Sequence, residues 1–384
     1  MKRAIRIHIE DREYANWIGG LYYKRNIIFS MLQNSKIRQN YNIIVNVNEK
    51  HRKYFEVFIN CKELIIRNNV KKKYDKIISF ALDILFNVKY VFDSDKNKWH
   101  KFINSCFISW IPDFQHLHYP DYFTEKENVG RTNKINEIYR NNQPLILSSK
   151  DALGDFEKYF GTRNNVFVIP FVSFIEPELK VLTPEYESAI IKKYEMDSMK
   201  YVCICNQFWK HKNHIVVFEA IKLLFQRHND MDVKFVFTGS SHDYRNPEYY
   251  ASIKKVIDDD YVKPYIKMLG FIDRIEQLAI MKNSSFIIQP SLFEGWGIVV
   301  EDAKVLDKLM ILSDIPVHHE QMNENCILFD PHDPNDLVDK ILIMLNWQHD
   351  EDIGKGLADM YCKAELYSQG FINLFEENKC GKSL

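Results

Sequence analysis

Short runs of β-branched and other apolar residues alternate along this chain with longer stretches of helical periodicity. This alternation is typical of parallel sheets with helices on both faces, so the chain is predicted to be a doubly wound α/β protein. The strands expected from these runs are Ala4–Ile9, Asn42–Val47, Lys76–Ser79, Cys106–Trp110, Pro144–Ser148, Val166–Ile169, Lys200–Ile204, Lys234–Thr238, Ile266–Leu269, Ser285–Gln289, Met310–Leu312 and Cys326–Phe329. The helices expected between and after them are Tyr22–Gln33, Asp151–Phe160, His214–Gln226, Tyr249–Asp258, Arg274–Lys282, Gly297–Leu306, Pro334–Leu345 and Ile353–Glu377.

A length of 384 residues is too great for one ordinary core and predicts two domains. The boundary is placed near 173–186, where Pro177 and Pro184 are expected to interrupt any regular element. The predicted domains are 1–175 and 176–352, followed by a terminal helix in 353–384.

Composition narrows the class of protein. Hydrophobic residues make up 46% and charged residues 27%, which is globular, and a net charge of −1 offers no long-range attraction for nucleic acid. The seven cysteines are scattered without C-x-x-C pairs, which argues against zinc or disulfide frameworks and for a reducing cytoplasm. No apolar run is long enough to span a bilayer. Peripheral contact with the inner membrane face stays open through Lys71, Lys72 and Lys73, although a solvated loop or helix start explains them as well.

The segment after the apolar run 286–288 is a glycine-containing turn that leads into a predicted helix. Two carboxylates, Glu294 and Glu301, stand seven residues apart across it. Glycines let backbone N–H groups approach an anion, and the helix N-terminus offers partial positive charge. The first carboxylate could accept sugar hydroxyls and the second ribose hydroxyls. The alternative is an ordinary strand–turn–helix connection in which Glu301 is a solvated first-turn acid.

The pattern E-G-x-G-x-x-x-E at 294–301 resembles the donor-sugar signature of glycosyltransferase family 4, the glycosyl transferases group 1. That resemblance implies a retaining enzyme of the GT-B fold, with two Rossmann-like domains facing a central cleft and a terminal helix that crosses back to the first domain. It implies a donor-binding set in this segment of Glu294, Gly295, Trp296, Gly297, Ile298, Val299 and Glu301.

A second segment, 203–214, leaves a predicted strand and enters a predicted helix. In family 4 an Arg and a Lys five apart bind the donor diphosphate here, and the matching positions are Gln207 and Lys212. A glutamine can donate a hydrogen bond but adds no charge, so Lys210 or the helix N-terminus could compensate. The string at 207–214 resembles a subgroup from bacterial surface-polysaccharide pathways. A basic helix start on the surface is the alternative.

A third segment, 110–123, follows a predicted strand of the first half. Many relatives carry a His-Asp pair here, but Pro112 precedes Asp113 in this chain. Two histidines remain at i and i+2, which would point apart, and His116 is favoured over His118 for contact with the donor sugar. A zinc site of Asp113, His116 and His118 is the alternative, and it lacks a fourth ligand at suitable spacing.

Two further loops enter the expected site through the resemblance. Gly19 and Gly20 are predicted as a turn that opens a helix, with backbone amides near the donor phosphates. The loop containing Phe271 packs against the nucleobase in relatives, whereas the residues themselves also suit a plain turn with Asp273 as an N-cap.

The expected activity is transfer of a hexose from a GDP- or UDP-linked sugar to a hydroxyl of a glycan or lipid-linked glycan. The expected catalytic residues are Glu294, Lys212, His116 and Asp113, with the leaving diphosphate stabilised by Lys212 and Gln207. No metal or other cofactor is expected, because the acidic run 258–260 follows a helical pattern and not a strand. A sugar-nucleotide epimerase and a non-catalytic nucleotide-binding subunit stay open as alternatives.

Overall fold

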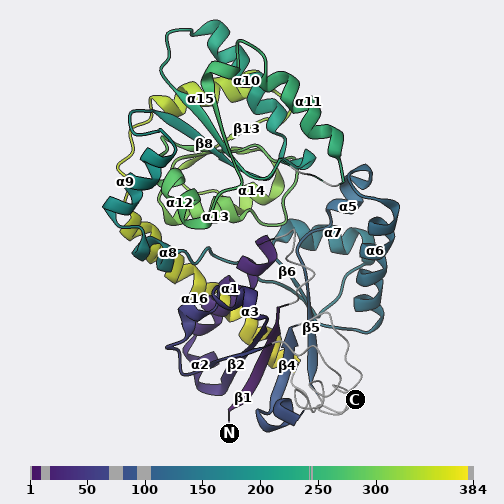
Figure 1. The fold of residues 1–384 in the computed structure, drawn as a ribbon. Coiled ribbons are helices and arrows are strands. Elements are labelled where there is room, and N and C mark those ends of the chain that lie inside the picture. The colour runs from purple at the N-terminus through teal and green to yellow at the C-terminus, as the bar shows by residue number, and fades with distance from the viewer. Residues whose placement is uncertain are drawn as a thin grey trace. The chain divides into compact units, whose positions relative to one another are not determined.

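The computed structural model describes residues 2–9, 18–68, 81–92, 105–241, 243 and 245–378. It divides into two compact units (Figure 1). The first unit takes residues 1–114, 129–174 and 360–384, and the second takes 115–128 and 175–359. The expected strand Lys76–Ser79 and the lysines at 71–73 lie outside the described residues.

The first unit is built on a parallel sheet of seven strands in the order β3-β2-β1-β4-β5-β6-β7. These strands are β1 Arg3–His8, β2 Tyr41–Val47, β3 Leu64–Asn68, β4 Val88–Phe92, β5 Cys106–Ile111, β6 Leu145–Leu147 and β7 Val166–Val168. Its helices include α1 Ile18–Gln33, α2 Ser35–Asn40, α3 Glu49–Arg52, most of α6 Glu125–Arg140, and α7 Lys150–Phe160. Strands β3 and β4, and helix α6, were not predicted from the sequence.

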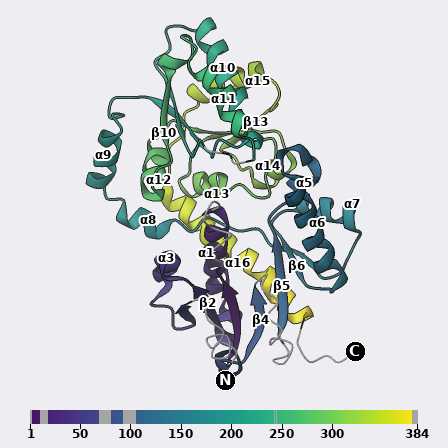
Figure 2. The same cartoon turned by 45° about the vertical axis from the view of Figure 1, so that its right-hand side comes forward.

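The last helix, α16 Ile353–Glu377, belongs to the first unit from Met360 onwards and runs alongside α1 (Figures 1 and 2). Its contacts there are specific. The Tyr90 hydroxyl donates to the Phe375 carbonyl at 2.6 Å, and Asn34 Nδ2 donates to Ser368 Oγ at 2.9 Å. A side chain at Gly370 would come within 2.9 Å of Ile169, so the helix packs closely on the end of β7.

The second unit has a six-stranded parallel sheet in the order β10-β9-β8-β11-β12-β13. The strands are β8 Tyr201–Cys205, β9 Lys234–Thr238, β10 Ile266–Gly270, β11 Ile287–Gln289, β12 Met310–Ser313 and β13 Cys326–Phe329. The helices are α5 Gln115–His118, α8 Glu176–Val181, α9 Pro184–Lys193, α10 His214–Arg227, α11 Pro247–Ile257, α12 Arg274–Asn283, α13 Ile298–Val305, α14 Pro316–Gln321 and α15 Pro334–Leu345. Figure 1 shows α10, α11 and α15 on one face of this sheet and α12 and α13 on the other. The predicted doubly wound class is confirmed.

The expectation that residues 173–186 form an irregular linker is wrong. Helices α8 and α9 occupy it, with Pro177 and Pro184 in their first turns. Proline is tolerated there because the first N–H groups of a helix have no intrahelical acceptor to lose. The prolines therefore begin these helices where the sequence suggested that they would break them.

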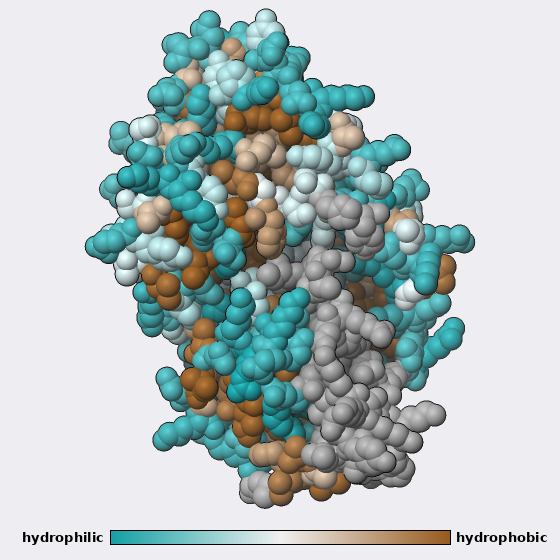
Figure 3. Space-filling view, in the orientation of Figure 1, coloured by the Kyte–Doolittle hydropathy of each residue, from teal (hydrophilic) through white to brown (hydrophobic). Residues whose placement is uncertain are grey.

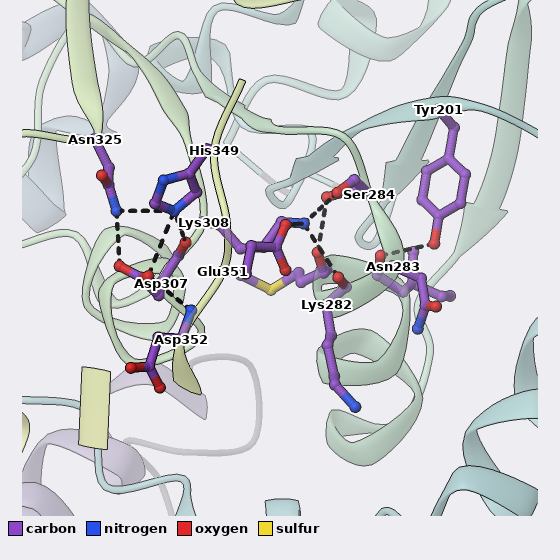
Figure 4. Close-up of polar contacts among 12 residues, drawn as sticks. Tyr201, Lys282, Asn283, Ser284, Asp307, Lys308, Asn325, His349, Glu351 and Asp352 are labelled. Atoms are coloured by element: carbon purple, nitrogen blue, oxygen red, sulfur yellow. Dashed lines mark hydrogen bonds and ion pairs between the residues drawn. The ribbon is translucent and has the colours of Figure 1, made fainter. Parts of the chain in front are cut away.

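The carboxyl end of α13 is held by a polar cluster shown in Figure 4. Asp307 has a left-handed backbone, with φ of 52°, and its carboxylate accepts from Asn325 Nδ2 at 2.8 Å and from the Asp352 amide at 2.9 Å. The buried Lys308 ammonium donates to the Glu351 carboxylate. These contacts fasten the stretch before α16 to the helix that carries Glu301.

The molecular surface shown in Figure 3 is mostly hydrophilic, and apolar residues form smaller groups on it. None of the helices in the described ranges is both long and apolar enough to cross a membrane.

Candidate active site

The turn after β11 places the Glu294 carboxylate among hydrogen-bond donors. Its Oε1 accepts from Gln289 Nε2 at 2.8 Å, from Ser291 Oγ at 2.7 Å, and from the Lys212 ammonium. Only 9% of the side chain is exposed. Burial by itself would raise the pKa of Glu294, but the Lys212 charge and the hydrogen bonds outweigh it and hold the pKa below its ordinary value. Glu294 is therefore an ionised, fixed acceptor at neutral pH.

Lys212 comes from the other motif that the sequence singled out, at the exit of β8. Residues 206 to 213 leave the strand, form a short 3-10 turn over 210–212, and enter α10. Asn213 closes the turn in a left-handed conformation with φ of 53°, and its amide donates to the carbonyls of Pro290 at 3.2 Å and Pro331 at 2.8 Å. The Leu292 amide donates to the His211 carbonyl at 2.8 Å. The two motifs are thus fixed to each other through backbone as well as through the ion pair.

Two buried amides beneath this pair were not identified from the sequence. Asn206 at the end of β8 and Gln289 at the end of β11 exchange hydrogen bonds of 2.9 and 3.2 Å. Gln289 Nε2 then reaches Glu294. A polar residue directly after a buried apolar strand was the available signal, but its partner lies more than 80 residues away in the sequence.

Glu301 is buried in the first turn of α13, with 2% of the residue exposed. Its Oε1 accepts from Lys304 Nζ at 2.7 Å and from Gln321 Nε2 at 2.8 Å. Gln321, from α14, also bonds both the amide and the carbonyl of Gly297 at 3.1 Å. The alternative reading of Glu301 as a solvated acid is wrong. Lys304 and Gln321 were missed because nothing in their local sequence marks them.

His318 lies behind the same turn and is fully buried. Its Nδ1 lies 2.8 Å from the Ser313 carbonyl, which fixes the proton on Nδ1, and Nε2 has no hydrogen-bond partner among the described residues. Burial lowers the pKa of His318 to about 4 despite the nearby negative charge of Glu294. His318 Nδ1 also lies 3.1 Å from the Ser313 hydroxyl, which in turn donates to the Ser291 carbonyl at 2.5 Å. Through Ser313, the neutral imidazole supports the turn that holds Glu294.

The three candidate residues of the 110–123 segment, Asp113, His116 and His118, have different surroundings. Asp113 forms an ion pair of 3.1 Å with Arg131 in the first unit. His116 is buried beside Phe123, whereas His118 is exposed with its ring centroid 5.1 Å from that of Phe293. The two histidines therefore contact different aromatic side chains. Within the ranges that the structure describes, no group of three or more His, Cys, Asp or Glu side chains could hold a metal.

For the remaining candidate residues outside 294–301, no hydrogen bond to Lys212, Glu294 or Glu301 is found among the described residues. Gly19 and Gly20 lie inside the first turn of α1, so the expected Gly-Gly turn before the helix is wrong in its boundary. Gln207 is half-buried and lies in the same loop as Lys212. Phe271 follows Gly270, which has a φ of 70°, and 63% of the phenylalanine is exposed. Asp273 occupies the N-cap position of α12 but its side chain makes no capping bond.

Part of this chain resembles a known protein family. The family model for glycosyl transferases group 1 matches residues 187–356, which include Lys212, Glu294 and Glu301. The O-antigen chain mannosyltransferase RfbU of Salmonella typhimurium is 22% identical over 219 residues, which cover 50% of this chain and 59% of that protein. An uncharacterized glycosyltransferase of Methanocaldococcus jannaschii is 26% identical over 37% of this chain and 38% of its own length. The chain is therefore matched over less than two thirds of these curated relatives.

Solved structures extend the likeness in fold to the whole chain. HepE of Anabaena, crystallised with UDP and glucose, has a TM-score of 0.64 at 13% identity and is covered over 98% of both chains. Sucrose-phosphate synthase of Thermosynechococcus elongatus has a TM-score of 0.60 at 13% identity, over 98% of this chain and 94% of its own. The two parallel-sheet units are those of the GT-B fold. Residues 187–356 of this chain are thus similar to the glycosyl transferases group 1, and the whole chain shares the GT-B fold.

Proposed function

We propose that this protein is a retaining glycosyltransferase that moves a hexose from a GDP- or UDP-linked sugar to a hydroxyl of a glycan or lipid-linked glycan. The observation that carries the proposal is the buried pair of Lys212 and Glu294, held at the ends of neighbouring strands by Gln289 and Ser291. The surface-polysaccharide setting is supported by the likeness to an O-antigen mannosyltransferase, and the nucleotide-sugar donor by the likeness in fold to a protein solved with UDP and glucose.

The leaving group explains the need for Lys212. As the bond between sugar and diphosphate breaks, negative charge grows on the phosphoryl oxygens, and a fixed ammonium in a water-poor site stabilises that charge more than it stabilises the bound substrate. Lys212 is already desolvated and held by Glu294, so it needs little reorganisation when the charge develops. Gln207 would add a neutral donor where many relatives have an arginine. The protein would thus use its own groups in place of a metal.

The two glutamates hold different parts of the donor in this proposal. Glu294 is an ionised acceptor suited to sugar hydroxyls. The two hydrogen bonds made to Glu301 by described residues both end on Oε1, so Oε2 would accept the ribose hydroxyls. Trp296 and Gly297 would lie along the donor between the two carboxylates.

His118 replaces His116 as the proposed neighbour of the donor sugar. His116 is buried against Phe123, whereas His118 is exposed against Phe293, the residue before Glu294. Asp113, Gly19 and Gly20 lie in the first unit. The resemblance implies a catalytic role for Asp113 and a place for the two glycines near the donor phosphates and the acceptor. If the acceptor is lipid-linked, the protein would bind peripherally to the inner face of the membrane.

A ligand panel tests the proposal directly. The protein is mixed with GDP, UDP, GDP-mannose and UDP-glucose, and its thermal stability is followed, since a ligand at a hundredfold its dissociation constant stabilises by about 2.7 kcal/mol. The donor that binds is then incubated without acceptor and the products are separated. Slow release of free sugar supports a transferase. A new sugar nucleotide would identify an epimerase, and an unchanged donor would identify a nucleotide-binding subunit.

A further inference from the structure

The segment 115–128, hereafter the strap, comes from the first half of the sequence but belongs to the second unit. It lies on three loops that follow strands of the second sheet. After β11, the Tyr119 ring meets the edge of Phe293 at 6.3 Å between centroids. After β8, the Lys210 ammonium lies 4.6 Å from the centre of the Tyr122 ring. After β9, Asn246 Nδ2 donates to the Tyr122 carbonyl at 3.5 Å.

Arg245 joins the strap to these loops. Its guanidinium lies 4.9 Å from the centre of the Phe123 ring in the strap and 4.8 Å from that of Trp209 in the β8 loop. Asp243 holds the side chain from behind, with Nε 3.3 Å from Oδ1. The exposed fractions of the two charged side chains are only 7% and 1%. A buried cation fixed between two aromatic rings is an organised contact and not a solvated surface charge.

We propose that Arg245 is a positioning residue for the donor sugar, which acts by clamping the strap onto the loops that carry Lys212 and Glu294. This inference rests on the proposed function. Phe293 immediately precedes Glu294, and the strap covers Phe293 with His118 and Tyr119. Trp209 lies three residues before Lys212 in the same loop. The clamp therefore fixes the wall next to the sugar subsite without touching the nucleotide.

The planar shape of arginine is what the clamp requires. A guanidinium stacks on aromatic rings through its flat face, whereas a lysine ammonium is a compact, strongly hydrated charge. Arg245→Lys keeps a positive charge beside the buried Asp243, so it avoids leaving that carboxylate alone, and it removes the stacked plane. The substitution therefore distinguishes the contribution of the planar guanidinium from that of the positive charge.

The test compares affinities for UDP and GDP with those for UDP-glucose and GDP-mannose, measured by calorimetry on the wild type and on Arg245→Lys. We expect the nucleotide sugar to bind about tenfold more weakly to the variant, as loss of a desolvated cation–π contact predicts, while the plain nucleotide binds as before. The KM for the donor should rise in parallel. Phe123→Leu, which removes the other side of the clamp, should reproduce the effect.

Arg163→Lys is the matched control, because the Arg163 guanidinium lies 5.1 Å from the centre of the Tyr139 ring within the first unit, to which the strap does not belong. It should change neither affinity. An equal loss for nucleotide and nucleotide sugar in Arg245→Lys would overturn the proposal in favour of a direct phosphate contact or a general folding role. No loss for either would show that the strap does not shape the sugar subsite. If the wild type binds no nucleotide sugar, the proposed function itself fails.

Discussion

The two units differ in how completely they organise their predicted site residues. In the second unit, two motifs more than 80 residues apart meet in one ion pair, and amides, hydroxyls and backbone groups hold both partners. In the first unit, Gly19 and Gly20 lie in α1, whereas Asp113 follows β5 and pairs with Arg131. A developing phosphoryl charge demands fixed, desolvated partners, whereas recognition of neutral hydroxyls tolerates looser and more variable loops. Under the proposed function, the second unit would therefore hold the leaving diphosphate.

The largest expected effect comes from removing the fixed cation. Lys212→Ala should reduce turnover by about 10² to 10³, because the lost contact acts mainly in the transition state. Steady-state kinetics with saturating donor measure it. Lys210→Ala is the control, since that ammonium lies over the Tyr122 ring and outside the Glu294 network. If Lys210→Ala proves the more damaging change, the phosphate-binding residue has been placed on the wrong lysine.

The second unit should also respond to acid, because burial lowers the pKa of two of its histidines, His214 and His318. Burial lowers the pKa of His318 to about 4 and that of His214 to about 3, the latter aided by the Lys212 charge. The unfolded chain takes up these protons near pH 6.5 while the folded chain does not, so stability is lost as the pH falls below about 6.5. Each pKa unit corresponds to about 1.4 kcal/mol, so His318 by itself accounts for roughly 3 kcal/mol between pH 7 and pH 4.

Denaturant unfolding at pH 7 and pH 5 checks this dependence. His318→Gln keeps a polar side chain of similar length but cannot take up a proton, so it should flatten the pH dependence. The matched substitution His228→Gln, at the half-buried C-cap of α10, is measured alongside it. Equal pH slopes for the wild type and His318→Gln would mean that His318 does not remain neutral in the folded protein.

A smaller effect is expected at the ribose end of the donor. Glu301→Ala should weaken binding of the nucleotide by roughly 1–3 kcal/mol, because hydroxyls would lose a charged acceptor. It also leaves Lys304 and Gln321 without their shared partner. Glu301→Gln keeps an acceptor for both and therefore isolates the charge. Calorimetry with GDP and UDP measures both variants, and unchanged affinities would remove Glu301 from the ribose subsite.

The smallest expected effect is that of a chelator. Activity should persist in excess EDTA, because Lys212 and backbone dipoles are proposed to do the work of a metal. The acidic run at 258–260 is the main competing candidate, and Asp259 in it already pairs with Lys222 at 2.7 Å. Loss of activity with EDTA that magnesium or manganese restores would show that carboxylates of the first or second unit hold a catalytic ion.

Local sequence was sufficient for most of the second unit. All six strands of this unit and its helices α10 to α13 and α15 lie within two residues of their predicted ends. Buried parallel strands are continuous apolar runs, and the turn that ends β11 carries its own glycines and carboxylates. Local sequence predicted less of the first unit. Its strands β3 and β4 are short, lack a strong local pattern and were missed. The resemblance to family 4 pointed to Lys212 and Glu294, and the structure joins these two residues in an ion pair.

Only the tertiary structure decided which side chains complete the site. Gln321 reaches Gly297 and Glu301 from another helix, and Asn206 meets Gln289 across neighbouring strands. The prolines at 177 and 184 begin helices because α8 and α9 have packing partners in α12. The docking of the strap likewise joins residues near 120 with residues beyond 290. Periodicity and turn chemistry are local properties that a sequence displays directly, whereas partnership between distant side chains depends on how helices and strands pack.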